Sequence, residues 1–242
     1  MSTPIFSLTD IHFEYLNGPK VLSGLNFSLH AHERIGIIGP NGTGKTTMAH
    51  ILMGLVKPSK GRIHFHGEPV SAERDFLPLR QSIGLLFQNA EDQLIYPTVL
   101  EDVAFGPLNM GKSSQEAKEI ALRVLSELGL EGFDNRITHR LSGGEKKLVS
   151  LAAVLAMDPE ALFLDEPTNA LDAKTRAHLV EILNSLNKAL VIISHDWDFL
   201  AQTTESIYSM KDGKITLDGD TQTHQHVHAH SHGSTPHVHG DS

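Results

Sequence analysis

Short apolar runs, separated by turns and by amphipathic segments, recur along most of the chain. Residues 34–38, 161–165 and 190–194 are brief apolar runs bounded by polar or turn residues. This pattern is typical of the central parallel strands of an α/β sheet, which are buried on both faces. Residues 113–128 instead place apolar side chains at helical spacing, with a capping box at the start and Gly129 after the end. Strands and helices in this arrangement predict an α/β fold.

A glycine-rich loop joins the first of these strands to a helix expected over residues 46–55. Residues 39–46 match the pattern G-x-x-x-x-G-K-[ST]. In such a loop the glycines let backbone N–H groups approach phosphates, Lys45 offsets the β- and γ-phosphate charge, and Thr46 ligates Mg²⁺. A glycine-rich turn that binds nothing is the alternative, but the flanking strand and helix favour an ATP site. The expected nucleotide contacts are Gly39, Asn41, Gly42, Gly44, Lys45, Thr46 and Thr47.

A strand ending in two carboxylates follows later in the chain. Asp165 and Glu166 come directly after the apolar residues 161–164. Taken alone, such a run is commonly a strand that reaches a solvated turn. Its position after a phosphate loop favours metal-assisted phosphoryl transfer, in which Asp165 would hold Mg²⁺ and Glu166 would polarise the attacking water.

Residues 141–145, Leu-Ser-Gly-Gly-Glu, combine a helix cap with exposed helix N–H groups. Ser142 and Glu145 can cap the following helix, while Gly143 and Gly144 leave its N–H groups open to an anion. Together with the two motifs above, this segment resembles the signature of the ABC ATPase family. The resemblance implies a P-loop NTPase with a RecA-like core, an antiparallel β subdomain and an inserted helical subdomain. It also implies that the signature segment binds the γ-phosphate held by another subunit, in a homodimer or a heterodimer.

The resemblance covers roughly residues 5–217 and implies roles for four more side chains. Gln88 resembles the glutamine that touches Mg²⁺ and reports to a membrane partner, and its alternative is a polar strand end. His195 resembles the histidine that contacts the γ-phosphate and helps to organise the water. Asp172 matches the loop that couples the two sites, and Tyr15 matches the aromatic residue that stacks on adenine. The alternative for His195 is a structural histidine, and the alternative for Tyr15 is a core tyrosine.

Two further stretches, residues 87–94 and 101–109, are similar to the energy-coupling factor branch of the family. ATPases of that branch power the uptake of vitamins and of cobalt or nickel, so the resemblance implies integral membrane transporter subunits as partners. Ala90 stands where the branch usually has proline, and Leu148 stands where the helix after the signature often has arginine. Neither difference changes a residue with a chemical role. Many of these ATPases also carry a C-terminal dimerisation segment, whereas here a hairpin at residues 212–213 leads into a tail.

The composition changes after residue 220. Residues 221–242 consist mostly of His, Thr, Ser and Gly, so we expect an ATPase domain over residues 1–220, with a helical lobe near residues 95–158, and a mobile tail. Imidazoles without thiolates suit Ni²⁺, Co²⁺, Zn²⁺ or Cu²⁺, and we interpret the tail as a Ni²⁺- or Co²⁺-binding segment. The interleaved Val, Ala and Pro argue against a purification tag. The histidines are His224, His226, His228, His230, His232, His237 and His239.

The overall composition narrows the function further. A net charge of −9 without a dominant basic block disfavours a nucleic-acid partner, and the lack of cysteine excludes thiolate metal sites. No apolar run approaches the roughly 18 residues of a membrane span. We therefore predict a peripheral ATPase, held at the cytoplasmic face of the membrane by its partners, that energises uptake of nickel or cobalt.

Three alternatives stay open at this point. One is a zinc or vitamin importer, and another is a metal buffer or sensor in which ATP binding is secondary. The third, an ABC ATPase acting on DNA, would need a long coiled coil between the phosphate loop and the signature segment. No sustained heptads occur there. The sequence does not distinguish nickel from cobalt, or a homodimer from a heterodimer.

Overall fold

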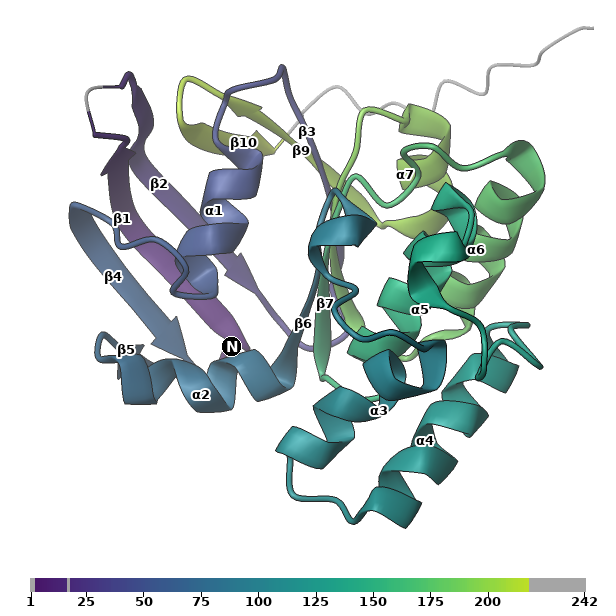
Figure 1. Ribbon diagram of the computed structural model, residues 1–242. Coiled ribbons are helices and arrows are strands. Elements are labelled where there is room, and N and C mark those ends of the chain that lie inside the picture. The colour runs from purple at the N-terminus through teal and green to yellow at the C-terminus, as the bar shows by residue number, and fades with distance from the viewer. Residues whose placement is uncertain (1–2, 17, 218–242) are drawn as a thin grey trace, which may run out of the picture.

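Two β-sheets and a group of helices build the protein, as Figure 1 shows. The computed structural model describes residues 3–16 and 18–217. The tail expected over residues 221–242, its mobility and its metal-binding histidines lie outside the described residues. None of the helices in the described ranges is long and apolar enough to cross a membrane.

The larger sheet has six strands in the order β10-β9-β3-β8-β7-β6. Strands β9, β3, β8, β7 and β6 are parallel, and β10 pairs with β9 in an antiparallel hairpin. The three apolar runs predicted to be central strands are β3, β8 and β7, side by side, so that prediction is confirmed. Their carboxyl ends meet at one edge of the sheet, where ligands bind in open α/β folds. The strands are β3 (Arg34–Ile38), β6 (Ile83–Leu86), β7 (Ala161–Asp165), β8 (Ala189–Ile193), β9 (Ser206–Lys211) and β10 (Lys214–Leu217).

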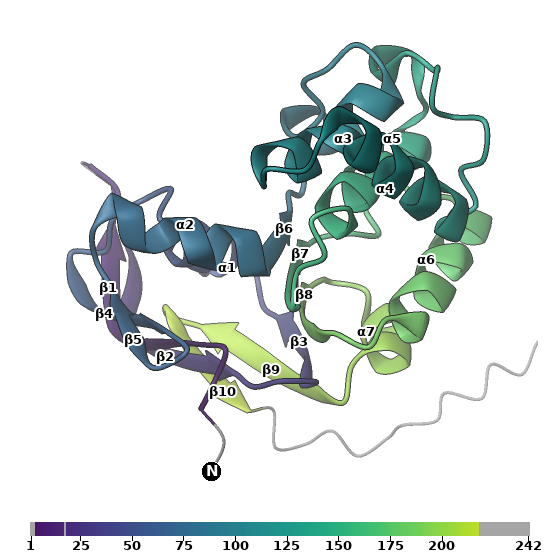
Figure 2. The ribbon, with the colours of Figure 1, turned by 90° about the horizontal axis from the view of Figure 1, so that it is seen from below.

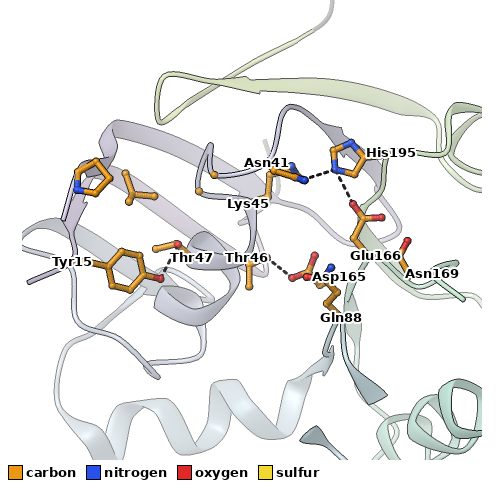
Figure 3. Close-up of a pocket in the computed structure, with 14 residues that line it drawn as sticks. Tyr15, Asn41, Lys45, Thr46, Thr47, Gln88, Asp165, Glu166, Asn169 and His195 are labelled. Atoms are coloured by element: carbon orange, nitrogen blue, oxygen red, sulfur yellow. Dashed lines mark hydrogen bonds and ion pairs between the residues drawn. The ribbon is translucent and has the colours of Figure 1, made fainter. Parts of the chain in front are cut away.

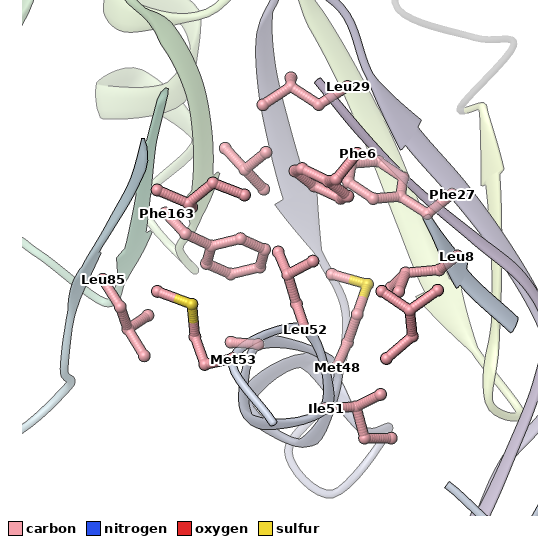
Figure 4. Packing of buried hydrophobic residues seen from close by; sticks show 14 of the residues in the cluster. Phe6, Leu8, Phe27, Leu29, Met48, Ile51, Leu52, Met53, Leu85 and Phe163 are labelled. Atoms are coloured by element: carbon pink, nitrogen blue, oxygen red, sulfur yellow. The ribbon is translucent and has the colours of Figure 1, made fainter. Parts of the chain in front are cut away.

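The smaller sheet is antiparallel, with the order β2-β1-β4-β5. Helix α1 (Lys45–Leu52) lies between the two sheets, and its side chains Met48, Ile51 and Leu52 are fully buried against both of them (Figure 4). This shared core fixes the start of α1, and with it the glycine-rich loop, beside the parallel strands. The strands are β1 (Phe6–Glu14), β2 (Lys20–Leu29), β4 (Lys60–Phe65) and β5 (Glu68–Val70).

Helix α1 is shorter than the sequence predicted, because it ends at Leu52 and not at residue 55. Gly54 follows with a positive φ of 68°, which ends the helix. A Cβ atom at that position would lie 2.7 Å from the ring of Phe76, so the close approach of helix α2 (Glu73–Ser82) requires a glycine there. The composition of residues 53–55 did not reveal this contact.

Helices α3 to α7 cover the other face of the parallel sheet, whereas α2 packs beside α1 in the core shared with the smaller sheet. Figure 2 shows α3, α4 and α5 grouped on the side away from the smaller sheet. Helix α5 joins this group to the sheet, since its buried residues Leu151 and Ala152 belong to the same core as Leu162 and Leu164 of β7. The helices are α2 (Glu73–Ser82), α3 (Val99–Asn109), α4 (Ser114–Glu127), α5 (Gly143–Leu155), α6 (Ala173–Ser185) and α7 (Trp197–Thr203), with 3₁₀ turns η1 (Ala90–Asp92) and η2 (Thr138–Arg140).

The predicted capping box at the start of α4 is present. The side chain of Ser113 accepts a hydrogen bond from the N–H of Glu116 at 3.3 Å, and Oε2 of Glu116 accepts one from the N–H of Ser113 at 2.9 Å. Gly129, at φ 68°, follows the C-cap Leu128. Both predicted ends of this helix are confirmed, because the signals are local in the sequence.

Candidate active site

The glycine-rich loop runs from the end of β3 to the start of α1, as predicted. Gly39 and Gly44 have φ values of 152° and 104°, and a Cβ atom on either would lie within 2.6 Å of other atoms, the carbonyl oxygen of Met210 and the side chain of Leu22 respectively. Gly42, at φ 80°, has nothing within 4 Å of a Cβ position. The loop therefore passes closely over its neighbours on one side and leaves backbone groups open on the other.

Lys45 holds this loop in shape from within. Its side chain is buried, and Nζ donates hydrogen bonds to the carbonyl oxygens of Gly39 at 2.6 Å and Pro40 at 3.0 Å. Burial lowers the pKa of Lys45, while the carboxylates of Glu166 and Asp165 act in the opposite direction. A buried ammonium held by two carbonyls can exchange those partners for phosphate oxygens, which are better acceptors.

Thr46 and Asp165 meet across the loop. Oγ1 of Thr46 donates a hydrogen bond to Oδ2 of Asp165 at 2.6 Å. Burial raises the pKa of Asp165, and the hydrogen bond from Thr46 lowers it. Gln88, which follows the end of β6, lines the same cavity beside Asp165 (Figure 3). Hydroxyl, carboxylate and amide oxygens are the donors that Mg²⁺ prefers, so these residues fit that ion.

Glu166 and His195 form the second polar group of the site. Glu166 is buried and has a positive φ of 46°, and its N–H donates to the carbonyl oxygen of Ile193 at 2.9 Å. Nε2 of His195 lies 3.3 Å from Oε1 of Glu166 and 3.1 Å from Oδ1 of Asn41. Burial raises the pKa of Glu166, whereas His195 lowers it. A non-glycine residue at positive φ is strained, and such strain is often found at functional sites.

A cavity of about 610 Å³ connects these groups. Tyr15 lies at one end and Glu166 and His195 at the other, as Figure 3 shows. Tyr15 is 46% exposed, and its hydroxyl lies 3.2 Å from Oγ1 of Thr47. Its ring is perpendicular to that of Phe13, with ring centres 4.8 Å apart. The cavity is lined by Tyr15, Pro19, Val21, Asn41, Gly42, Gly44, Lys45, Thr46, Thr47, Gln88, Asp165, Glu166, Asn169 and His195.

Five of the predicted site residues do not line this cavity within the described part of the chain. They are Gly39, Ser142, Gly143, Gly144 and Asp172. Gly39 shapes the loop from behind, as its close approach to β9 shows. The other four residues belong to the signature segment, residues 141–145, and to the start of α6, which do not line the cavity within the described residues.

The signature segment caps α5 as the sequence predicted. The N–H of Ser142 donates to Oε2 of Glu145 at 2.8 Å, and the N–H of Glu145 donates to the Ser142 hydroxyl at 3.3 Å. A Cβ atom on Gly144 would lie 3.4 Å from Thr175, near the start of α6. Asp172 caps α6 by accepting from the N–H of Thr175 at 2.9 Å, and this bond lowers the pKa of Asp172. The signature segment and the Asp172 loop are therefore neighbours.

The sequence did not single out three residues that line the cavity. Asn169 follows Glu166 by three positions in the same turn, so its proximity could have been inferred from that spacing. Pro19 directly precedes β2 and Val21 lies in it, and only the packing of the smaller sheet brings them to the loop. No local signal in the sequence identifies those two.

Known proteins of one family are similar to this chain over most of its length. The profile of the ABC transporter family matches residues 22–169. A putative ABC transporter ATP-binding protein of Nitratidesulfovibrio vulgaris is 51% identical over 98% of this chain and 82% of its own length. The energy-coupling factor transporter ATP-binding protein EcfA of Methanocaldococcus jannaschii is 41% identical over 89% of this chain and 78% of its own length.

Two solved structures are similar in fold. One is cbiO1 of Clostridium perfringens, described as part of the ABC transporter complex cbiONQ, with a TM-score of 0.79 and 33% identity over 89% of this chain and 88% of that one. The other is a dimeric bacterial ABC transporter cassette, with a TM-score of 0.79 and 30% identity over 87% of this chain and 96% of that one. The predicted fold class, a P-loop NTPase of the ABC type, is confirmed.

Proposed function

This chain belongs to the ABC transporter family, and we propose that it is the ATP-hydrolysing subunit of an energy-coupling-factor-type importer for nickel or cobalt ions. ATP binding and hydrolysis follow from the family. The observation that most strongly supports this function is the hydrogen bond between Thr46 and Asp165, which lies in the same cavity as Glu166 and His195.

The substrate ATP would bind along the cavity from Tyr15 to His195. Tyr15 is partly exposed at the cavity, so its ring could stack on adenine, and such stacking needs no hydrogen-bond partner. Backbone N–H groups around Gly42 and the ammonium of Lys45 would bind the phosphates. Lys45 would exchange its bonds to the carbonyls of Gly39 and Pro40 for bonds to phosphate oxygens.

Thr46, Asp165 and Gln88 would hold Mg²⁺. When bound, the ion neutralises charge on the β- and γ-phosphates. Asp165 must be ionised for this role, although burial raises its pKa, and the Thr46 hydroxyl favours that ionised form. Glu166 would accept a proton from the attacking water, and His195 would orient the water and contact the γ-phosphate. Asn41 lies within hydrogen-bonding distance of His195 and would fix the position of its ring.

The signature segment would complete the site of a second subunit. Ser142, Gly143 and Gly144 do not line the cavity of their own chain within the described residues, yet they form the N-terminus of a 13-residue helix, where N–H groups attract anions. A dimer would bring this end to the γ-phosphate held by the partner, with Asp172 beside it. The similarity to a dimeric ABC transporter cassette supports this arrangement.

A cleft between the helical lobe, helices α3 to α5, and the edge of the parallel sheet would receive the membrane subunit. It has a volume of about 310 Å³, and Leu55, Ile95 and Phe105 are exposed along it. Oδ1 of Asp102 accepts hydrogen bonds from the N–H groups of Ile95 and Tyr96, at 2.9 and 3.1 Å. Oδ2 of Asp102 is buried and has no hydrogen-bond partner within the described residues.

A cleft with exposed Leu55, Ile95 and Phe105 side chains suits a helix that brings an apolar face. We assign that helix to an integral membrane subunit of the importer. This contact would hold the ATPase at the cytoplasmic face of the membrane as a peripheral protein.

Nickel or cobalt as cargo rests on two features. The tail carries seven histidines, and residues 87–94 and 101–109 are similar to the energy-coupling factor branch. Full-length protein should bind Ni²⁺ in a calorimetric titration, and a chain truncated at Gly219 should lose that binding while its ATPase rate is unchanged. Equal Ni²⁺ binding by both forms would remove the tail from the proposal.

Transport itself tests the proposed function. The chain should be reconstituted with the integral membrane subunits that co-purify with it, and uptake of Ni²⁺, Co²⁺, Zn²⁺ and vitamins should be measured with and without ATP. ATP-dependent accumulation of Ni²⁺ or Co²⁺ is expected. Accumulation of Zn²⁺ or a vitamin alone would assign the subunit to another importer.

A further inference from the structure

Two adjacent lysines of α5 contact the loop formed by residues 87–93, which carries Gln88. Nζ of Lys147 donates hydrogen bonds to the backbone carbonyl oxygens of Phe87 at 3.1 Å and Gln88 at 2.6 Å. Lys146 forms an ion pair with Glu91 of the same loop. Lys147 therefore binds the backbone at the start of the loop, and Lys146 binds a side chain in the η1 turn.

The two contacts differ in their exposure to solvent. Lys147 is only 3% exposed, and a buried ammonium is stable only when it is paired and hydrogen-bonded. Burial lowers the pKa of Lys147, and the carboxylates of Asp165 and Glu166 oppose that effect. Glu91 is largely exposed, so its pair with Lys146 is an outer contact that solvent weakens.

Other hydrogen bonds of the loop do not reach α5. The side chain of Gln93 accepts from the N–H of Phe87 at 3.2 Å and donates to the carbonyl of Leu85 at 3.3 Å. Asn89 accepts from the N–H of Glu91 at 3.2 Å. These bonds stiffen the loop and tie it to β6, whereas the lysines tie it to the helix.

We propose that Lys146 and Lys147 are positioning residues that make Gln88 move together with α5. The helix begins at Gly143 directly after Ser142, so both lysines lie within about one turn of the signature segment. A shift of α5 on engagement of a partner's nucleotide would therefore carry the backbone of Gln88 with it. The functional consequence rests on the proposed roles of Gln88 and of the signature segment, whereas the anchor itself does not.

Lys147→Met tests the anchor, because it keeps the length of the side chain and removes the donor. Lys188→Met is the matched control, since Nζ of Lys188 also donates to a backbone carbonyl, that of Pro159 at 2.6 Å, far from the loop in sequence. Hydrogen exchange of the amides of residues 87–93 should be measured by mass spectrometry on the full-length protein. Faster exchange is expected for Lys147→Met alone, and exchange equal to that of the wild type would overturn the anchor.

A double-mutant cycle with Gln88→Ala tests the functional consequence. Lys147→Met should raise the Mg²⁺ concentration for half-maximal ATP hydrolysis by about tenfold when Gln88 is present, and by less than about twofold in Gln88→Ala. An equal rise in both backgrounds would show that Lys147 does not act through Gln88, and would overturn the proposal. If Gln88→Ala alone keeps the wild-type dependence on Mg²⁺, the role given to Gln88 under the proposed function is wrong, and the exchange measurement still decides the anchor.

The outer pair offers a test that leaves the protein interior intact. Glu91→Lys and Lys146→Glu should each speed exchange in the loop, because each places like charges together. The double exchange of charge should bring the rate back to within about twofold of the wild type. A double variant no better than the single ones would exclude the outer pair from the anchor.

Discussion

Oγ1 of Thr46 and Oδ2 of Asp165 lie 2.6 Å apart, although 119 positions separate them in the chain. This hydrogen bond joins the start of α1 to the end of β7. It places a hydroxyl donor and a carboxylate, both from buried elements, where one cation can contact both. The contact also lowers the pKa of Asp165 against the effect of its burial.

Thr46→Val should weaken the response to Mg²⁺. The substitution keeps the branched shape and removes the hydroxyl, so Asp165 loses its donor and the ion loses a ligand. The Mg²⁺ concentration for half-maximal ATP hydrolysis should rise by about tenfold or more. Thr203→Val is the control, because its hydroxyl bonds the carbonyl of Phe199 in the core. The same Mg²⁺ dependence for Thr46→Val and wild type would remove Thr46 from the metal site.

Glu166→Gln should abolish steady-state hydrolysis and leave ATP binding intact. The amide cannot accept a proton from water, whereas Lys45, Thr46 and Asp165 are unchanged, and the rate should fall by at least about 100-fold. Turnover and binding of a fluorescent ATP analogue should be measured together, with Glu160→Gln as the control for loss of one carboxylate near β7. Near wild-type turnover would show that Glu166 is not the base.

Arg136 should support ATP-dependent dimerisation, because its positive charge compensates the negative charge of Glu145 in the signature segment. Its Nη1 lies 2.9 Å from Oε1 of Glu145, and its guanidinium stacks on Phe133 at 3.5 Å. Arg136→Met would leave the Glu145 charge uncompensated where an anion is to dock, and ATP-dependent dimerisation should weaken by about threefold to fivefold. Adding Glu145→Gln should restore it. If the double variant stays as weak as Arg136→Met, charge compensation is not the reason for the contact.

Asp102→Asn should change how stability depends on pH. Burial raises the pKa of Asp102 in the folded protein, so the folded chain keeps a proton that the unfolded chain has lost above about pH 4. The stability of the wild type therefore falls, relative to Asp102→Asn, as pH rises from about 4 through the raised pKa. Urea unfolding at several pH values measures the difference. Parallel pH profiles for the two proteins would contradict a raised pKa.

Local signals in the sequence were sufficient for much of the fold and site. The glycine loop, the capping boxes at Ser113 and Ser142, and the strand ending at Asp165 all depend on residues close together in the chain, and they could be predicted. The central strands could be predicted as well, because burial on both faces leaves uninterrupted apolar runs.

Contacts between distant segments could not be predicted in this way. The approach of Gly54 to Phe76 shortened α1, and no pattern within residues 46–55 encodes it. The bond from Lys147 to the carbonyl of Gln88 likewise depends on how α5 packs beside β6. Backbone carbonyls carry no residue identity, so a partner of this kind leaves no trace in the sequence.

A mixing experiment with two inactive variants tests the central claim, an ATPase whose sites are shared between subunits. Lys45→Ala removes the phosphate-binding ammonium from the glycine-rich loop of one chain. Ser142→Arg blocks the signature segment of the other chain. A mixed dimer then retains one complete site, built from the Ser142→Arg chain's phosphate loop and the Lys45→Ala chain's signature segment. ATP hydrolysis in an equal mixture should recover to about a quarter of the wild-type rate, since half of randomly paired dimers are mixed and each has one of two sites. No recovery at any mixing ratio, or full activity of Ser142→Arg alone, would contradict the shared site.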